Sequence, residues 1–202
     1  MQAVNIHPYY FSSQKRLFDL FLSSLLLILF SPFLVCLILV LWLSIGWPIF
    51  FVQKRAGKTK HTFTLYKFRT MITSAECCKP YLRAQNEAPE PMFKMQQDPR
   101  FIGIGRWLSR TGLDELPQLV NIWRGEMSFV GPRPLPVDEA EQLPKSWDFR
   151  YLVKPGLVSE WVLSEKKYRS LNAWRQVERK PLQFSNIASD VALLAQIAKV
   201  AL

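Results

Sequence analysis

Residues 17–45 of the chain read LFDLFLSSLLLILFSPFLVCLILVLWLSI, an almost unbroken apolar run. No charged residue occurs between Leu20 and Gln53. A run of this length is typical of a membrane-inserted helix and exceeds the apolar region of a cleaved signal peptide. Because no small-residue cleavage site follows it, we expect the run to remain in the mature protein. The sequence therefore predicts a chain that is embedded in a membrane through its N-terminal segment.

Ser31 and Pro32 lie in the middle of this run and predict a break in the membrane helix. Proline removes a backbone donor and clashes with the preceding turn, so a straight helix should kink there. The arm from Leu17 to Ser31 would be only ~22 Å long, against a hydrocarbon core of ~30 Å. We also expect the Ser31 hydroxyl to bond a carbonyl group that the proline leaves free.

Basic residues flank the apolar run on both sides. Lys15 and Arg16 precede it, and four basic residues follow within 54–60. Positive residues prefer the cytoplasmic side of a membrane, so a single crossing would put one cluster on the wrong face. We therefore expect a re-entrant helix that enters the membrane, breaks at Ser31-Pro32 and returns. The alternative is a proline-kinked helix that crosses once, since prolines are common in such helices.

The rest of the chain has the size and composition of one folded domain. The protein has 202 residues, 49% of them apolar and 13% aromatic, which excludes the profile of a disordered chain. The net charge is +10, and nearly all of it lies after residue 50. Such an excess indicates an anionic partner: nucleic acid, a phosphorylated substrate or the acidic face of a bilayer. Charge alone does not choose among these.

The cysteines and histidines form no metal or disulfide pattern. Cys36 lies in the apolar run, Cys77 and Cys78 are adjacent, and no CxxC pair exists. His7 and His61 have no neighbours that suggest a catalytic triad or a zinc site. We therefore expect reduced thiols, and we expect any acid, base or nucleophile to be a carboxylate.

The expected fold is mainly α with a small β-hairpin, an α+β arrangement. Residues 49–55 and 62–69 are rich in β-branched and aromatic types around a glycine-containing loop, which predicts a hairpin at the membrane surface. Its basic side chains either hold the body against anionic lipid or are merely solvated. Helical segments are expected within 73–85, where Pro80 interrupts them, and at 106–110, 116–123 and 136–152.

An amphipathic helix is expected at the C-terminal end, because Phe184, Ile187, Val191 and Leu194 recur at helical spacing with Asp190 elsewhere. Such a helix packs on the body or lies in the membrane interface, and the pattern does not decide between the two. The chain thus divides into a membrane segment (1–48), a cytoplasmic catalytic domain (49–180) and a C-terminal amphipathic helix (181–202).

Asp114 and Glu115 are the most informative pair in the sequence, within LSRTGLDELPQLVN at 108–121. Gly112 ends the preceding element, and Pro117 is tolerated only in the first turn of a helix, so both carboxylates should lie at a helix N-terminus. Adjacent acids there could hold a hard cation such as Mg²⁺ and attack a phosphorus atom. The alternative is ordinary N-capping.

Arginines surround this pair in the sequence. Arg100, Arg106 and Arg110 lie upstream, and Arg133 lies downstream within Gly-Pro-Arg-Pro at 131–134. The guanidinium fork matches phosphate oxygens, and the two prolines restrict the backbone around Arg133. A lone Pro-Arg-Pro is more often a rigid turn. Combined with the acidic pair and a membrane segment, it favours phosphoryl transfer at a bilayer surface.

Four blocks of the sequence resemble the monotopic phosphoglycosyl transferases, also called the bacterial sugar transferase family. They are KRLFD (15–19) before a run containing Ser31-Pro32, QKRAGKTKHTFTLYKFRTM (53–71), DPRFIGIGRWLSRTGLDELPQLVNIWRGEMSFVGPRPL (98–135) and KPG (154–156). The similarity covers about residues 15–160, and the block through LDELPQL and SFVGPRP is highly specific.

The resemblance implies a reaction in which Asp114 displaces UMP from a UDP-sugar and forms a phosphosugar-aspartyl intermediate, which a polyprenyl (undecaprenyl) phosphate then collects. It implies that Glu115 associates with Mg²⁺, and it supports the re-entrant helix. It further implies a location in the bacterial inner membrane, with the catalytic domain facing the cytoplasm, at the first membrane step of a glycan pathway. The residues that it suggests for binding the phosphates or the nucleotide are Lys67, Arg69, Arg110, Gln118 and Arg133.

The sequence departs from the family pattern after Gly156, where LVSEWVLSEK (157–166) introduces Glu160 and Glu165 and the later glycines are absent. This affects the choice of sugar more than the chemistry. A rival hypothesis is a non-catalytic, membrane-tethered basic protein that binds a partner or nucleic acid. The intact acidic pair argues against it, so we expect no nucleic-acid partner, and the sequence leaves open whether a homodimer forms.

Overall fold

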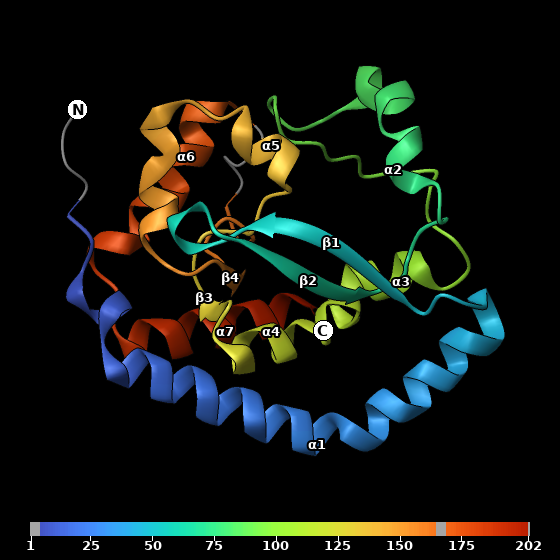
Figure 1. The fold of residues 1–202 in the computed structure, drawn as a ribbon, viewed down its shortest axis with the longest axis horizontal. Coiled ribbons are helices and arrows are strands. Elements are labelled where there is room, and N and C mark those ends of the chain that lie inside the picture. The colour runs from blue at the N-terminus through green and yellow to red at the C-terminus, as the bar shows by residue number, and fades with distance from the viewer. Residues whose placement is uncertain (1–4, 165–168, 202) are drawn as a thin grey trace.

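The computed structural model describes residues 5–164 and 169–201, which leaves the expected acidic residue Glu165 outside the described residues. Within these ranges one long helix lies along one side of a body made of short helices and two small sheets (Figure 1). The mainly helical fold class is therefore confirmed. The proposed division at residues 48 and 180 stays a prediction. Both end segments share a hydrophobic core with the body.

Helix α1 (Ser13–Ile45) contains almost the whole apolar run and is the one described helix long and apolar enough to cross a membrane. The helix continues through Pro32 without interruption and bends in its middle part (Figure 1), which agrees with the predicted kink, while the re-entrant path stays a prediction. Pro32 cannot donate to the carbonyl of Ile28, and the Ser31 hydroxyl donates to that carbonyl at 2.8 Å. The predicted Ser31 bond is thus confirmed, and this bond explains how the helix tolerates the proline.

The N-terminal end of α1 is fixed to the body by buried polar contacts. The Lys15 ammonium lies 2.5 Å from the Asp190 carboxylate, which also accepts a hydrogen bond from Tyr9. The Asp19 carboxylate accepts hydrogen bonds from the Ser128 hydroxyl and the Phe129 N–H, both at 3.1 Å. These contacts cross more than a hundred residues of sequence, so they hold the helix against a distant part of the chain.

The C-terminal end of α1 is fixed to the same body. Leu37 and Leu41 are buried there against Phe68 and Leu108. Between these two ends the helix curves outward (Figure 1), with Leu22, Leu26 and Leu27 still packed against the core. Along its whole length, helix α1 leaves large apolar side chains exposed, among them Leu17, Phe21, Ile28, Leu29 and Leu43.

Strands β1 (Phe50–Ala56) and β2 (Thr62–Phe68) form the predicted antiparallel hairpin. Phe51 pairs with Lys67 and Gln53 pairs with Leu65, so these four side chains share one face of the hairpin. Arg55 follows Gln53 by two residues and lies on that same face. One basic side chain from each strand, Arg55 of β1 and Lys67 of β2, therefore faces the body.

The short helices confirm most of the predicted segments. Pro80 separates a short helix from a 3₁₀ segment, and helices occupy the two positions expected on either side of Gly112. Helix α6 was not predicted. The helices are α2 (Ala75–Cys78), α3 (Gly105–Thr111), α4 (Gln118–Arg124), α5 (Val137–Glu141), α6 (Leu171–Arg179) and α7 (Ile187–Ala201). The 3₁₀ segments are Pro8–Phe11, Lys58–Lys60, Pro80–Gln85, Leu113–Glu115, Lys145–Leu152 and Pro181–Gln183.

A second sheet, which the sequence did not reveal, joins strand β3 (Ser128–Val130) in parallel to strand β4 (Gly156–Val158). The two chains approach very closely after β3, because a Cβ atom on Gly131 would lie 2.6 Å from the Lys154 carbonyl oxygen. A Cβ atom on Gly156 would lie 2.1 Å from the Gly131 nitrogen. Glycine is therefore required at both positions, and this contact ties the 131–134 motif to the 154–156 motif.

Helix α7 packs on the body through Leu193, Leu194 and Ile197. Asp190 was expected on the polar face of this helix, away from the apolar stripe. That placement is wrong, because only 1% of the residue is exposed. Its burial follows from the ion pair with Lys15, which offsets the cost of removing the carboxylate from water. Ile187 and Val191, from the predicted apolar stripe, are exposed instead.

Candidate active site

Asp114 and Glu115 lie in a 3₁₀ turn between helices α3 and α4. Gly112, with φ of 73°, ends α3 in a left-handed conformation, and Pro117 caps the start of α4. Both carboxylates therefore stand directly before a helix, as the sequence predicted. Asp114 is buried, while Glu115 is half-buried and lines a large cavity.

Lys67 of strand β2 reaches both carboxylates. Its ammonium nitrogen lies 2.5 Å from a Glu115 oxygen and 3.7 Å from an Asp114 oxygen. The hairpin face that carries Lys67 is thus packed against the turn that carries the acids. The Lys67 ammonium therefore bridges the two negative charges of the pair.

The two carboxylates have different acidities. Burial raises the pKa of Asp114 to about 6; the attraction of Lys67 opposes this rise, and the charge of Glu115 adds to it. Burial also acts to raise the pKa of Glu115, but Lys67 and Arg133 together hold it below its usual range. Glu115 is therefore the more acidic partner. Asp114 remains mainly ionised at neutral pH and would gain most from a further cation beside it.

Two adjoining cavities, of about 610 and 370 Å³, meet at this pair. Lys67, Arg55, Arg133 and Lys94 line both of them. Burial and repulsion from Arg133 lower the pKa of Arg55 to about 10, and burial with the same neighbour lowers the pKa of Lys94. Several cations thus face one another across the space, an arrangement that a bound anion would stabilise.

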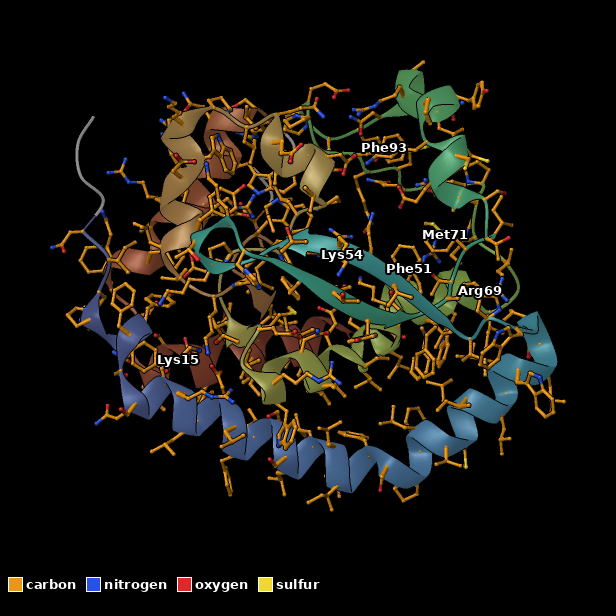
Figure 2. The ribbon with its side chains drawn as sticks, in the orientation of Figure 1. Lys15, Phe51, Lys54, Arg69, Met71 and Phe93 are labelled. Atoms are coloured by element: carbon orange, nitrogen blue, oxygen red, sulfur yellow. The ribbon has the colours of Figure 1, made fainter. Side chains whose placement is uncertain are left out.

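The smaller cavity also has an apolar part on the α2 side of the hairpin. Phe51, Met71 and Phe93 come from three separate segments and all line it (Figure 2). Asp114 and Arg133 line the same cavity. A ligand with a phosphate and an apolar chain would find both kinds of surface here.

Arg133 is positioned by the motif that the sequence singled out. The Pro132 carbonyl accepts a hydrogen bond from the Gly156 N–H at 2.9 Å, and Arg150 donates to the carbonyl of Arg133 itself. The guanidinium carbon lies 5.6 Å from the centre of the Trp161 ring. The hydrogen bonds fix the backbone at Arg133, and the Trp161 ring holds its guanidinium group.

The other expected binding residues fall into two groups. Arg110 is exposed and lines the larger cavity, and buried Gln118 lines a small space beside Glu115 and Arg133. Arg69 is directed elsewhere, toward the end of α1 (Figure 2), where it donates to the carbonyls of Ile45, Gly46 and Pro48 at 2.5 to 2.9 Å. Arg69 nevertheless lines the smaller cavity together with Asp114, so its binding role stays a prediction.

Arg55 and Lys94 are site residues that sequence reasoning did not select. Arg55 was grouped with the basic residues of the hairpin surface, yet its side chain is directed inward and donates to the Pro134 carbonyl at 2.9 Å. Among the described residues its Nε atom is buried without a hydrogen-bond partner. Strand alternation was the available signal, since Arg55 and Gln53 share a face, whereas nothing near Lys94 distinguished it.

The donor set at the turn fits magnesium. Mg²⁺ is usually held by one or two carboxylates together with water and substrate phosphates. Asp114 and Glu115 supply such oxygen atoms, although the ammonium group of Lys67 lies beside both and would repel a Mg²⁺ ion on the same oxygens. Among the described residues no cluster of three or more metal-ligating side chains of His, Cys, Asp or Glu occurs, so a Mg²⁺ ion here would need water or substrate oxygens as well.

The family model of the bacterial sugar transferases matches residues 10–202. The undecaprenyl-phosphate galactose phosphotransferase of Salmonella typhimurium is 35% identical over 198 residues, which cover 93% of this chain and 40% of that protein. The exopolysaccharide production protein ExoY of Rhizobium meliloti is 39% identical over 154 residues, covering 74% and 68%. The UDP-glucose:undecaprenyl-phosphate glucose-1-phosphate transferase of Escherichia coli is 37% identical over 164 residues, covering 80% and 31%.

The chain thus spans about two fifths of the length of the Salmonella relative and about two thirds of ExoY. The carboxylate pair, the basic cavity and the long apolar helix all lie within the part that the family model matches. On this match, the chain belongs to the bacterial sugar transferase family.

Proposed function

We propose that the protein transfers a sugar phosphate from a UDP-sugar to undecaprenyl phosphate, the first membrane step of a bacterial polysaccharide pathway. The observation that carries this proposal is the buried Asp114 beside Glu115, at the meeting point of two cation-lined cavities. The names of the relatives from Salmonella and Escherichia coli support the lipid phosphate as acceptor. The second of these names supports a UDP-sugar as donor.

In the first step, a carboxylate oxygen of Asp114 attacks the phosphorus that carries the sugar. The bond from that phosphorus to the UMP oxygen breaks, and UMP leaves with the bonding electrons. Arg55, Lys94 and Arg133 line the space where the diphosphate would lie, and their charges would hold it and stabilise the negative charge that develops. The product of this step is a phosphosugar joined to Asp114.

In the second step, an oxygen of the lipid phosphate attacks the same phosphorus. The bond to Asp114 breaks and the free carboxylate is restored, so the atoms balance without a further reactant. The apolar part of the smaller cavity, with Phe51, Met71 and Phe93, would receive the lipid next to the phosphate. The larger cavity would then keep the nucleotide side of the site.

Mg²⁺, held by Glu115 and Asp114, would offset the charge repulsion between the carboxylates and the diphosphate. Lys67 would keep the pair oriented, because it contacts both acids. Gln118 and Arg110 line spaces around the pair and would complete the binding surface.

We further propose that α1 is re-entrant and that the body faces the cytoplasm of a bacterium at its inner membrane. Both ends of α1 contact the same body, and its middle bends away from it (Figure 1). The exposed apolar face of the helix would lie in one leaflet, and the basic residues at both ends would remain on the cytoplasmic side.

The test of the proposed function is a screen of UDP-sugars against purified full-length protein with undecaprenyl phosphate and Mg²⁺. We expect at least one donor to yield UMP and a lipid-linked diphosphosugar in equal amounts. The Asp148→Asn variant, which removes an exposed carboxylate paired with Lys60, serves as a control and should keep full activity. If no UDP-sugar yields either product while the protein is folded, a non-catalytic binding role becomes the better account.

A further inference from the structure

A second basic pocket lies at the N-terminal end of α1, apart from the site described above. It has a volume of about 140 Å³. None of its lining residues lines the cavities around the carboxylate pair. Its lining is Tyr10, Phe11, Ser12, Lys15, Arg16, Asp19, Lys58, Ser128 and Lys154.

Two charged groups in this lining, Lys15 and Asp19, are paired with each other and with neighbouring residues. Lys15 is paired with Asp190 and, at 3.5 Å, with Asp19. The Asp19 carboxylate also accepts hydrogen bonds from Ser128 and Phe129. These contacts attach α1 to the body, and the Asp19 carboxylate balances only one of the four positive charges in the lining, those of Lys15, Arg16, Lys58 and Lys154.

Three cations remain, and among the described residues none of them lies within ion-pair distance of a carboxylate. Arg16 donates to the carbonyls of Ile122 and Trp123 at the end of α4, at 2.8 and 2.7 Å. These neutral acceptors leave its charge unbalanced. Lys58 lies over the exposed Phe11 ring, with its nitrogen 5.1 Å from the ring centre.

Lys154 and Arg16, which both line the pocket, approach the same point beside Gly125. A Cβ atom built on Gly125 would lie 3.3 Å from the Arg16 guanidinium carbon and 3.3 Å from the Lys154 ammonium nitrogen. Burial lowers the pKa of Lys154, and repulsion from Arg16, Lys58 and Lys15 lowers it further, while the attraction of Asp19 acts in the opposite direction. Four cations gathered around a single carboxylate favour the binding of an anion with several oxygens.

The surroundings of the pocket indicate what kind of anion it takes. An exposed apolar side chain of α1 is close to its lining, since Leu17 directly follows Arg16 in the chain and is 64% exposed. Phe11, which lines the pocket, is 55% exposed, and Trp123, whose carbonyl Arg16 contacts, is 51% exposed. Tryptophan beside basic residues is typical of the membrane interface. The volume is also below the roughly 300 to 1,000 Å³ of sites for drug-sized ligands, which suits a single headgroup.

We propose that this pocket binds the phosphate of an anionic phospholipid, with Arg16, Lys58 and Lys154 as its cations and the lipid chains lying along the exposed face of α1. Such a lipid would fix the start of α1 at the height of the headgroups. It is a bound membrane lipid and not a substrate, because the pocket is separate from the carboxylate pair.

The test uses full-length protein and measures retained lipid by native mass spectrometry, without UDP-sugar or polyprenyl phosphate. The protein is titrated in detergent with phosphatidylglycerol and, separately, with phosphatidylcholine. We expect Lys58→Gln/Lys154→Gln to weaken retention of phosphatidylglycerol about thirtyfold, the combined effect of two lysines near an anionic surface. Retention of phosphatidylcholine should not change.

Two further variants separate the pocket from general charge and from folding. Lys54→Gln/Lys145→Gln removes the same charge from exposed positions outside the pocket, and Figure 2 shows Lys54 on the hairpin, separated from Lys15 at the pocket. Lys58→Arg/Lys154→Arg keeps the charge and should retain the lipid within about threefold of the original protein, since both cations pair with phosphate.

Three outcomes would overturn the proposal. Equal losses in the two glutamine variants would show that the effect is general charge. Unchanged retention in Lys58→Gln/Lys154→Gln would show that no lipid is held there. If inorganic phosphate binds with the same dependence on these lysines while phosphatidylglycerol does not, the pocket takes a free anion and the lipid assignment is wrong.

Discussion

Asp114 and Glu115 are neighbours in sequence, yet their surroundings separate their acidities. Glu115 has the shorter contact with Lys67 and its pKa is lowered, whereas burial raises that of Asp114 to about 6. A buried, less acidic carboxylate is the better nucleophile. This difference supports the bond-forming role for Asp114, while the metal role proposed for Glu115 depends on its place beside Asp114.

Glu115→Gln tests the division of roles at the scale of one residue. The amide keeps the size of the side chain but removes its charge, so we expect Mg²⁺ to bind at least tenfold more weakly and the rate to fall severely. The measurement is UMP release as a function of Mg²⁺ concentration. High Mg²⁺ should restore part of the rate. A rate that is low but shows an unchanged Mg²⁺ dependence would contradict a metal role.

Arg69 fastens the end of α1 to the hairpin. Its guanidinium donates to three carbonyls in the segment where α1 ends and β1 begins. The carbonyls at the end of a helix have no partners within the helix, so a charged donor there stabilises both the helix end and the connection.

Arg69→Gln should therefore destabilise the fold by about 3 kcal/mol, since charged hydrogen bonds to buried carbonyls are lost. The measurement is thermal or denaturant unfolding of the full-length protein in detergent. Arg83→Gln is the matched control, because Arg83 forms an ion pair with the exposed Glu90 and should contribute less than about 1 kcal/mol. Equal stabilities of the two variants would remove the role assigned to Arg69.

Pro32 lies in the middle part of α1, where the helix bends, and prolines are a common cause of such bends, so Pro32→Ala should let the helix straighten. A straight helix of 33 residues would be about 50 Å long, more than enough to span the bilayer. Straightening competes with the contacts at both ends of α1, so we expect the body to be displaced and transferase activity to fall. If activity and topology both survive the substitution, the bend does not have this role.

At the scale of the whole molecule, both ends of α1 meet one body, so we expect both to face the cytoplasm. Single cysteines at Asn5 and Lys60, in a background without the three native cysteines, test this with a membrane-impermeant thiol reagent. Both positions should be labelled only after the cells are opened. Labelling of either position in intact cells would contradict the re-entrant topology.

Local chemistry made the main elements predictable. Apolar length located α1, strand alternation located the hairpin, and Gly112 with Pro117 located the turn that carries the acids. Each of these signals acts within a few residues. The Ser31 bond to Ile28 was predictable for the same reason.

Contacts between distant segments were not predictable in this way. Asp190 resembled a polar surface residue until Lys15 was placed beside it, and Arg55 resembled a surface cation until the hairpin packed on the turn. The β3–β4 pairing also depends on chains that meet only in the folded molecule, where two glycines allow close approach. The local patterns of a single sequence do not indicate which distant segments will pair.

In the proposed reaction, Asp114 forms a covalent bond to the phosphosugar. The most direct measurement is the intact mass of the full-length protein after mixing with its UDP-sugar and Mg²⁺ in the absence of lipid acceptor. We expect a mass increase of one phosphosugar, with one UMP released per protein, and its disappearance when undecaprenyl phosphate is added. Asp114→Asn should show no increase and Asp148→Asn should show the full increase. An adduct on Asp114→Asn, or UMP release that requires both substrates together, would contradict the account.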